Sequence, residues 1–194
     1  MKKRGITTLW LLMVALVMMA KSYTVTSPNG QLTAQVEVGT VIKYSLKDAI
    51  QQLVLPSAIA LKTDRGTWGE NSHLRRAVKT THRGQIAAFA YKRNEVSDCY
   101  NQLRLQFKEG FDLIFRLYDE GMAYRFASTL KSEVTINDEQ AQMRFARDWK
   151  AQIPYVRDSG DREDQLHNSF ENNYTHTALS QLMDTRLIFT PLIV

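Results

Sequence analysis

Residues 111–126 read FDLIFRLYDEGMAYRF, and this stretch decides the fold class. It contains two short runs in which successive side chains are expected to point to opposite faces. Asp119-Glu120-Gly121 joins the two runs. A period of two is typical of half-buried β-strands, and a Gly-containing turn between two such runs predicts a hairpin. One face of the first run is wholly apolar, and it consists of Phe111, Leu113, Phe115 and Leu117. The stretch therefore predicts a β-sheet with one face turned toward a core.

Similar strand signals recur along most of the chain. Apolar and polar residues alternate over 32–38 and 42–46, which predicts an opening hairpin. Pro56 interrupts the apolar run of residues 53–61, so this segment is expected to be an edge strand or a strand broken by a bulge. Further strands are expected over residues 86–91, 103–107, 134–136, 143–145 and 186–194. Roughly nine or ten strand candidates separated by turns predict an all-β sandwich of antiparallel strands.

Three segments lack a clear period of two. Residues 70–84 are polar and are expected to form a connecting strand or loop with a solvated face. Residues 47–53 and 178–183 can each form one helical turn.

The apolar segment at residues 186–194 has nothing after it to cover it, and exposed apolar edges favour aggregation. This feature leads us to expect that the chain is a fragment of a longer protein.

The first twenty residues differ from the rest. Lys2, Lys3 and Arg4 precede an unbroken apolar run of about twelve residues, Leu9–Ala20. Since a transmembrane helix needs about 20 apolar residues, residues 1–20 are predicted to be a signal peptide of a periplasmic or secreted protein. The alternative is an uncleaved N-terminal anchor. After removal of the signal peptide, no membrane span is expected.

Charge and cysteine content narrow the function classes. The formal net charge is +5, and the signal segment supplies three of these charges with no acid among its residues. Because the remaining charges of both signs are interleaved, nucleic-acid binding is not expected. Cys99 is the one cysteine, so no internal disulfide can form, and it is expected to be a small buried residue.

The alternating stretch at residues 111–126 also carries a resemblance to a known family. Its pattern resembles the N-terminal domain of glycoside hydrolase family 97, the α-glucosidase and α-galactosidase family of Bacteroides-type bacteria. The opening turn at residues 25–30, the Leu55-Pro56-Ser57 segment and the stretch from Phe170-Glu171 to Pro191-Leu192 are similar to that domain in the same order. The resemblance covers residues 22–194.

The resemblance implies a galactose-mutarotase-like β-sandwich. In complete enzymes of the family, this domain packs on a catalytic (β/α)₈ barrel that cleaves oligosaccharides, and it supplies a Glu to a calcium site near the substrate. By resemblance, Glu171 is the expected calcium ligand. The catalytic carboxylates belong to the barrel, so no catalytic residue is expected in this chain, and the chain is not expected to be catalytic alone.

The chemistry of individual residues leaves several interpretations open. Asn173, Tyr174 and His176 offer amide, phenol and imidazole groups that sugar pockets use, although an exposed polar loop would look the same. Four nearby acids are expected to lie in a solvated loop: Asp158, Asp161, Glu163 and Asp164. Arg116 and Arg125 are expected to be sheet-surface charges. Trp68 and Trp149 are expected to pack in the core.

Two hypotheses follow from the sequence. The favoured one is the N-terminal domain of an exported α-glycoside hydrolase, which helps to form a carbohydrate pocket and docks on a catalytic barrel. The alternative is a stand-alone periplasmic β-sandwich that binds glycan or protein without catalysis.

Overall fold

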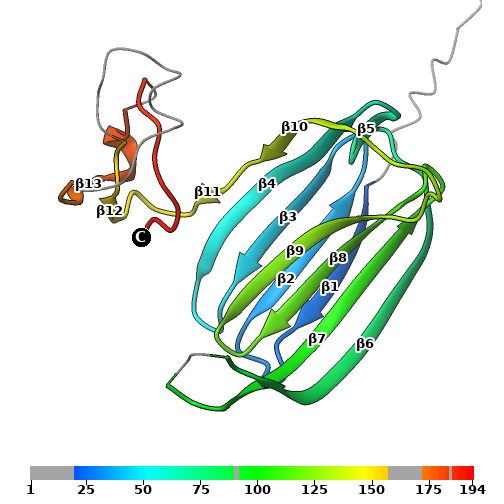
Figure 1. Cartoon of the computed structure of the whole chain (residues 1–194), viewed down its shortest axis with the longest axis horizontal. Helices are drawn as coiled ribbons and strands as arrows, with labels where there is room; N and C mark the ends of the chain where they lie inside the picture. The colour runs from blue at the N-terminus through cyan, green and yellow to red at the C-terminus, as the bar shows by residue number, and fades with distance from the viewer. Residues whose placement is uncertain (1–19, 90–91, 157–171, 184) are drawn as a thin grey trace, which may run out of the picture.

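The computed structural model describes residues 20–89, 92–156, 172–183 and 185–194, and it contains two large antiparallel sheets packed face to face (Figure 1). In the first sheet the strand order is β1-β2-β3-β4-β10, and β5 and β11 also pair with β4. Its strands are β1 (Lys21–Thr26), β2 (Thr33–Val38), β3 (Ile42–Lys47), β4 (Gln52–Thr63), β5 (Gly66–Trp68), β10 (Ile136–Ala141) and β11 (Arg144–Phe145). The predicted all-β sandwich is confirmed.

The second sheet has the order β6-β7-β8-β9. Its strands are β6 (Leu74–Ala87), β7 (Glu95–Phe107), β8 (Phe111–Tyr118) and β9 (Gly121–Ser128). The β8–β9 hairpin is the one that the sequence predicts, and Phe115 lies opposite Tyr124 in it. Among the described residues, no helix has the length and hydropathy needed to span a bilayer.

The core lies between the two sheets. The four apolar residues that alternate along β8, from Phe111 to Leu117, are all fully buried, as the sequence predicts. The ring of Phe111 stacks on Phe107 at 4.5 Å and on Trp68 at 5.0 Å, so Trp68 is a core residue as expected. Offset ring stacking adds to the stability gained from area burial alone. This aromatic stack joins β5 of the first sheet to the β7–β8 turn of the second sheet.

Pro56 lies at a bulge in β4. Tyr44 of β3 faces Ser57, whereas Leu46 faces Val54, so β4 has one extra residue between these two pairs. A bulge tolerates proline because the ladder hydrogen bond is already interrupted there. The bulge interpretation is therefore confirmed, and the edge-strand alternative is wrong, since β4 has partners on both sides.

Two sequence expectations about local structure in the sandwich need correction. Residues 48–51 form a turn and not a helix, because the Asp48 Oδ1 atom accepts the N–H groups of Ile50 (2.7 Å) and Gln51 (2.6 Å). Asp commonly directs turns in this way. Of the strand expected at residues 86–91, residues 86–87 form the end of β6, residues 88–89 are not in a strand, and residues 90–91 lie outside the described residues. Since β6 begins at Leu74, most of the polar segment at residues 70–84 is a strand, which is one of its two expected alternatives.

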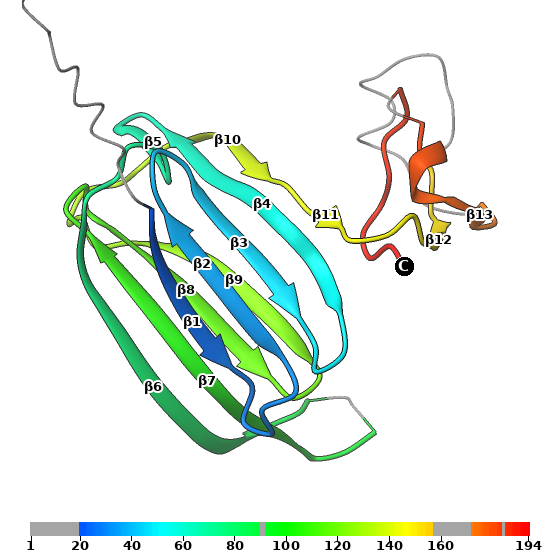
Figure 2. The same cartoon turned by 180° about the vertical axis from the view of Figure 1, so that it is seen from behind.

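The remaining elements form a small tail unit beside the sandwich, which Figure 2 shows from behind. We define it as residues 150–156, 172–183 and 185–194, which include β12 (Lys150–Ile153), β13 (Thr175–Ala178) and the short 3₁₀ helix η1 (Leu179–Gln181). The helical turn expected near residue 178 is confirmed by η1. The strand expected at residues 186–194 is wrong, because this segment forms no strand and makes two isolated bridges to other described residues, from Ile188 to Tyr155 and from Ile193 to Gln152.

Two smaller expectations concern single side chains. Trp149 is half-buried, and its ring lies 6.5 Å from that of Phe145 at the entrance to the tail unit. It therefore packs on an apolar neighbour, although not in the main core. Cys99 is half-buried on β7 with its sulfur 3.3 Å from the Ser97 hydroxyl, so it is less buried than expected.

Candidate functional site: the tail unit and its groove

The tail unit has a small core of its own. Ala151 and Ile153 of β12 are buried and alternate with exposed residues, as expected for a strand with one covered face. Tyr155 completes this cluster, and Leu179 and Ile188 pack against it. The cluster holds β12, η1 and the last residues together, and it thereby positions the polar residues of β13.

The sequence-predicted sugar-binding residues lie at the start of β13. Asn173, Tyr174 and His176 are all exposed. His176 lies opposite Gln152, whereas Thr175 lies opposite the buried Ile153. Since neighbouring residues of a strand point to opposite faces, His176 is on the outer face of the tail unit. The structure therefore brings the three residues together on one exposed segment.

Hydrogen bonds fix the residues that flank this segment. The Asp148 carboxylate accepts the Ser180 hydroxyl (2.7 Å) and the Ser180 N–H (2.8 Å). These bonds lower the pKa of Asp148, with the hydroxyl making the larger contribution. The Tyr155 hydroxyl accepts the N–H of Met183 at 3.0 Å. The guanidinium of Arg186 lies over the Tyr155 ring at 5.1 Å. Sequence reasoning missed these residues because their partners are distant in the chain.

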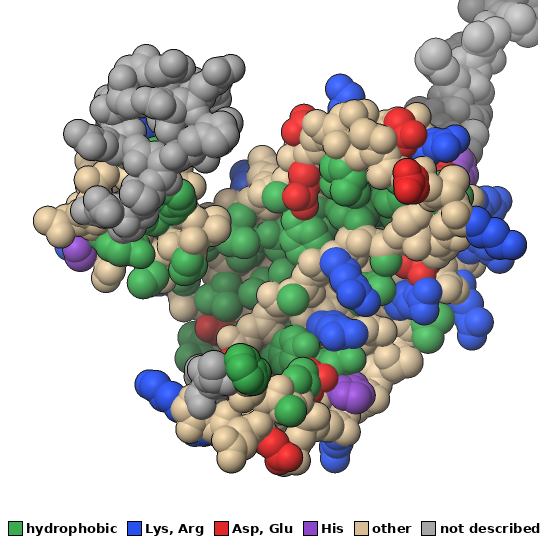
Figure 3. Space-filling model, in the orientation of Figure 1, with side chains coloured by type: hydrophobic (Ala, Val, Ile, Leu, Met, Phe, Trp, Pro, Cys, Tyr) green, Lys and Arg blue, Asp and Glu red, His purple; other side chains and the backbone are tan. Residues whose placement is uncertain are grey.

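An apolar groove of about 1050 Å³ lies between the tail unit and the β10–β11 segment. Its apolar walls include Met143, Phe145, Leu179, Leu182, Pro191 and Leu192. Met143 and the neighbouring Ile193 are each 54% exposed. Figure 3 shows hydrophobic side chains gathered on the tail unit and on the nearby part of the sandwich. Contiguous exposed apolar surface of this kind marks an interaction site.

The calcium ligand expected from the sequence, Glu171, lies outside the described residues, as do the acids at 158, 161, 163 and 164. In the described part of the chain, no three His, Cys, Asp or Glu side chains are grouped closely enough to hold a metal ion. Calcium needs six to eight oxygen ligands, as a general rule. Glu171 fits such a site only if other groups supply most of the oxygens.

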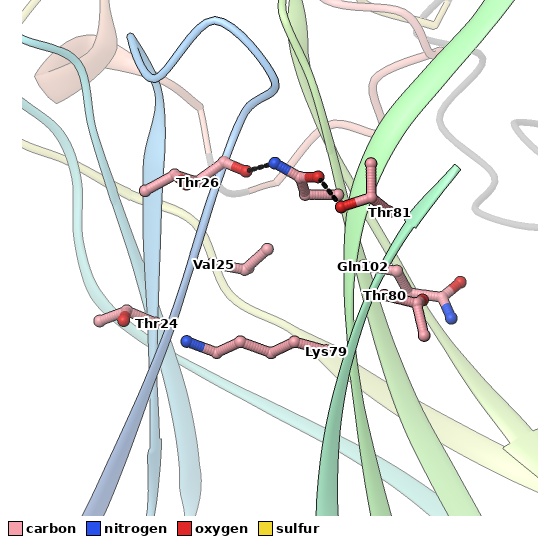
Figure 4. Close-up of a pocket in the computed structure, with 8 residues that line it drawn as sticks. Thr24, Val25, Thr26, Lys79, Thr80, Thr81 and Gln102 are labelled. Atoms are coloured by element: carbon pink, nitrogen blue, oxygen red, sulfur yellow. Dashed lines mark hydrogen bonds between the residues drawn. The ribbon is translucent and has the colours of Figure 1, made fainter. Parts of the chain in front are cut away.

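A second, polar cleft lies on the far side of the sandwich from the tail unit, between β1 and the β6–β7 edge (Figure 4). Its walls include Thr24, Thr26, Lys79 and Thr81. The Asn101 amide donates to the Thr26 carbonyl at 2.8 Å and accepts the Thr81 hydroxyl at 2.7 Å, so it bridges the two sheets. Sequence reasoning missed this cleft because its residues come from three separated strands with no shared motif.

The fold and the groove define an antiparallel β-sandwich domain with an exposed apolar flank. The family model described as "Glycosyl-hydrolase 97 N-terminal" matches residues 25–194. The chain therefore belongs to the glycosyl-hydrolase 97 N-terminal family.

Similar proteins agree with this assignment. A retaining α-galactosidase of Bacteroides thetaiotaomicron is 35% identical over 197 residues, which cover 100% of this chain and 30% of the galactosidase. A family 97 enzyme of Pseudoalteromonas sp. strain K8, solved with panose, matches with a TM-score of 0.70 and 18% identity over 88% of this chain and 26% of that chain. A β-arabinopyranosidase matches with a TM-score of 0.66 and 21% identity over 79% of this chain and 26% of that chain. The chain thus spans about a third or less of these relatives.

Proposed function

We propose that this chain acts as the N-terminal domain of an exported α-glycoside hydrolase and docks on a catalytic (β/α)₈ barrel. The observation that carries this proposal is the apolar groove beside β11. In an N-terminal domain of this family, an apolar surface that the domain alone leaves exposed is expected where a second domain covers it. Residues 1–20 would act as the export signal to the periplasm or exterior.

The same proposal gives a role to the residues at the start of β13. Asn173, Tyr174 and His176 are exposed on the tail unit that also forms one wall of the groove. Docking would bring them to the edge of the barrel, where they would contact hydroxyl groups of an oligosaccharide. Glu171 lies two residues before Asn173 in the sequence and would contribute one carboxylate to a calcium site completed by the barrel. Bound calcium would add positive charge beside the substrate.

A binding experiment tests the docking role. The catalytic barrel of the related retaining α-galactosidase, produced separately, is titrated with the 194-residue chain. Substitution of groove residues by Met143→Gln or Leu192→Gln should weaken binding by about tenfold or more, as expected for apolar residues at an interface. Ile50→Gln is the matched control, because Ile50 is 92% exposed on the β3–β4 turn outside the groove. Equal affinities for all three variants would exclude the groove as the docking surface.

A kinetic experiment tests the pocket role. With the docked pair and a nitrophenyl α-galactoside, His176→Ala should raise KM while the affinity of the two proteins stays the same. An unchanged KM would remove His176 from the pocket and would leave the docking proposal intact.

The polar cleft supports a second candidate function, a glycan-binding module without catalysis. Lys79 and four Thr residues line this cleft, and Lys79 has no ion-pair partner among the described residues. Tight binding of a neutral oligosaccharide by the isolated chain, lost in Lys79→Ala and kept in the groove variants, would favour this function over docking.

A further inference from the structure

The outer face of the second sheet carries an unusual arrangement of arginines. Across β7, β8 and β9, residues Arg104, Ile114 and Arg125 are direct neighbours in one row. Gln102, Arg116 and Ala123 form the next row. Side chains directly opposite on one sheet face lie close enough to interact. Arg116 and Arg125 therefore flank Ile114 from two directions on the same face.

Arg116 is held in a fixed position by its neighbours. Its guanidinium lies 4.2 Å from the centre of the Tyr100 ring, and its Nε atom donates to Gln102 Oε1 at 3.0 Å. Tyr100 is only 8% exposed although it belongs to an outer face, because the side chains of Arg116, Tyr118 and His82 cover it. A guanidinium fixed in this way loses little conformational freedom when its remaining N–H groups bind an anion.

The charges on this face are only partly compensated. Arg104 donates from Nε to the buried Asp112 carboxylate at 2.6 Å. By contrast, neither Arg116 nor Arg125 forms an ion pair with any described carboxylate. Figure 3 shows Lys and Arg side chains gathered over this sheet on the face toward the viewer. Two guanidinium groups are thus available to an anion.

A hollow of about 140 Å³ lies beside these two arginines. Its lining includes Ile114, Arg116, Tyr118, Ala123 and Arg125. The Tyr118 hydroxyl donates to Asp98 at 3.3 Å, so this ring is also held in place. The volume is well below that of pockets for drug-sized ligands, about 300–1000 Å³, and it suits one ring-sized group.

We propose that this hollow binds an acidic sugar residue, with its carboxylate on Arg116 and Arg125 and its ring against Tyr118 and Ala123. Arginine recognises carboxylates through paired N–H groups, and a tyrosine ring offers an apolar surface with a polar edge. The site is separate from the groove of the tail unit and from the polar cleft. It would attach the protein to uronate-containing glycans independently of any catalytic pocket.

Isothermal titration of the 194-residue chain with galacturonate oligosaccharides tests the site, with neutral galactose oligosaccharides as the matched ligand. Arg125→Ala should weaken binding of the acidic ligand by about tenfold or more, as expected for lost charge-assisted hydrogen bonds. Arg116→Lys keeps the charge but removes the paired N–H geometry, and it should also weaken binding. Arg76→Ala is the control, because Arg76 is exposed on the same sheet but does not line the hollow.

Each remaining outcome contradicts the proposal. Binding of the neutral ligand with equal affinity would exclude recognition of the carboxylate. Equal weakening by Arg76→Ala would show attraction by net charge alone, without a defined site. No binding of the acidic ligand, in a protein whose thermal unfolding is normal, would refute the site directly. If a galactose sulfate ester binds while galacturonate does not, the anion is a sulfate and the assignment of a uronate is wrong.

Discussion

The sandwich and the tail unit contain the same kind of secondary structure, yet they bury apolar side chains very differently. The sandwich encloses a continuous core to which both sheets contribute large residues such as Tyr44, Ile59 and Phe115. Among its described residues, the tail unit has a cluster of three buried side chains, Ala151, Ile153 and Tyr155, and it exposes several apolar residues around them. Since small units bury too little surface to be stable alone, the tail unit has the character of half an interface.

The largest expected effect comes from the sandwich core. Phe115 is fully buried, and its ring lies 5.8 Å from that of Tyr124. Phe115→Ala should lower the free energy of unfolding by about 3–5 kcal/mol, because the cavity lies among well-packed rings. Urea denaturation followed by circular dichroism measures this loss. Phe89→Ala is the control, since Phe89 is 100% exposed and its loss should change stability by less than about 0.5 kcal/mol.

A smaller and local effect is expected in the tail unit. Ile153 is also fully buried, but its cluster has few members. Ile153→Ala should therefore cost about 2 kcal/mol, the low end for such truncations, and it should affect only the tail unit. Hydrogen exchange should become faster for amides of β12 and β13 and stay the same in β7 and β8. Equal acceleration in both regions would show that the two regions unfold as one unit.

Polar substitution in the groove should leave stability nearly unchanged. Leu192 is 37% exposed and lines the groove. Leu192→Gln should lower the free energy of unfolding by no more than about 1 kcal/mol, because more than a third of the side chain is already exposed. It should also reduce binding of a hydrophobic dye and self-association, which light scattering detects. A large loss of stability would mean that Leu192 belongs to a core and not to an interface.

The sequence predicts the strands that have one buried face. The β8–β9 hairpin is correct because Phe111, Leu113, Phe115 and Leu117 alternate with residues of the outer face. The alternation of apolar and polar residues does not identify β6, whose residues are mostly polar. This strand lies at an open edge of its sheet, and charged side chains such as Lys79 protect edges from pairing with other chains. Its polarity reflects its position and not the absence of a strand.

Less of the candidate site than of the fold could be predicted from the sequence. Tyr174 and His176 can be singled out by their chemistry, and the structure places both on one exposed segment. The groove could not be predicted, because it joins residues around Met143 with residues around Leu192. The arginine hollow could not be predicted either, although Arg116 and Arg125 were identified as surface charges. Its shape depends on which residues of β8 and β9 lie opposite each other, and this register is seen only in the folded hairpin.

The smallest expected effect is the pH dependence that arises from two aspartates, Asp48 in the sandwich and Asp148 in the tail unit. Both carboxylates accept hydrogen bonds from nearby residues. The pKa of Asp48 is lowered by the N–H groups of Gln51 and then Ile50, in the β3–β4 turn of the sandwich. The pKa of Asp148 is lowered by the Ser180 hydroxyl and then the Ser180 N–H, in the tail unit. A folded-state pKa below the ordinary value of 3.8 means that each aspartate stabilises its region above that pH.

This stabilisation is lost as the pH falls from about 4 through the folded-state pKa of each group. We expect the amide of Ser180 to lose protection from exchange in this range, while amides in β4 keep theirs, since the sandwich core does not depend on Asp48. Asp148→Asn should remove the pH dependence at Ser180, and Asp48→Asn should leave it unchanged. Protection at Ser180 that persists to pH values well below the pKa of Asp148 would show that the small tail cluster alone holds η1 in place.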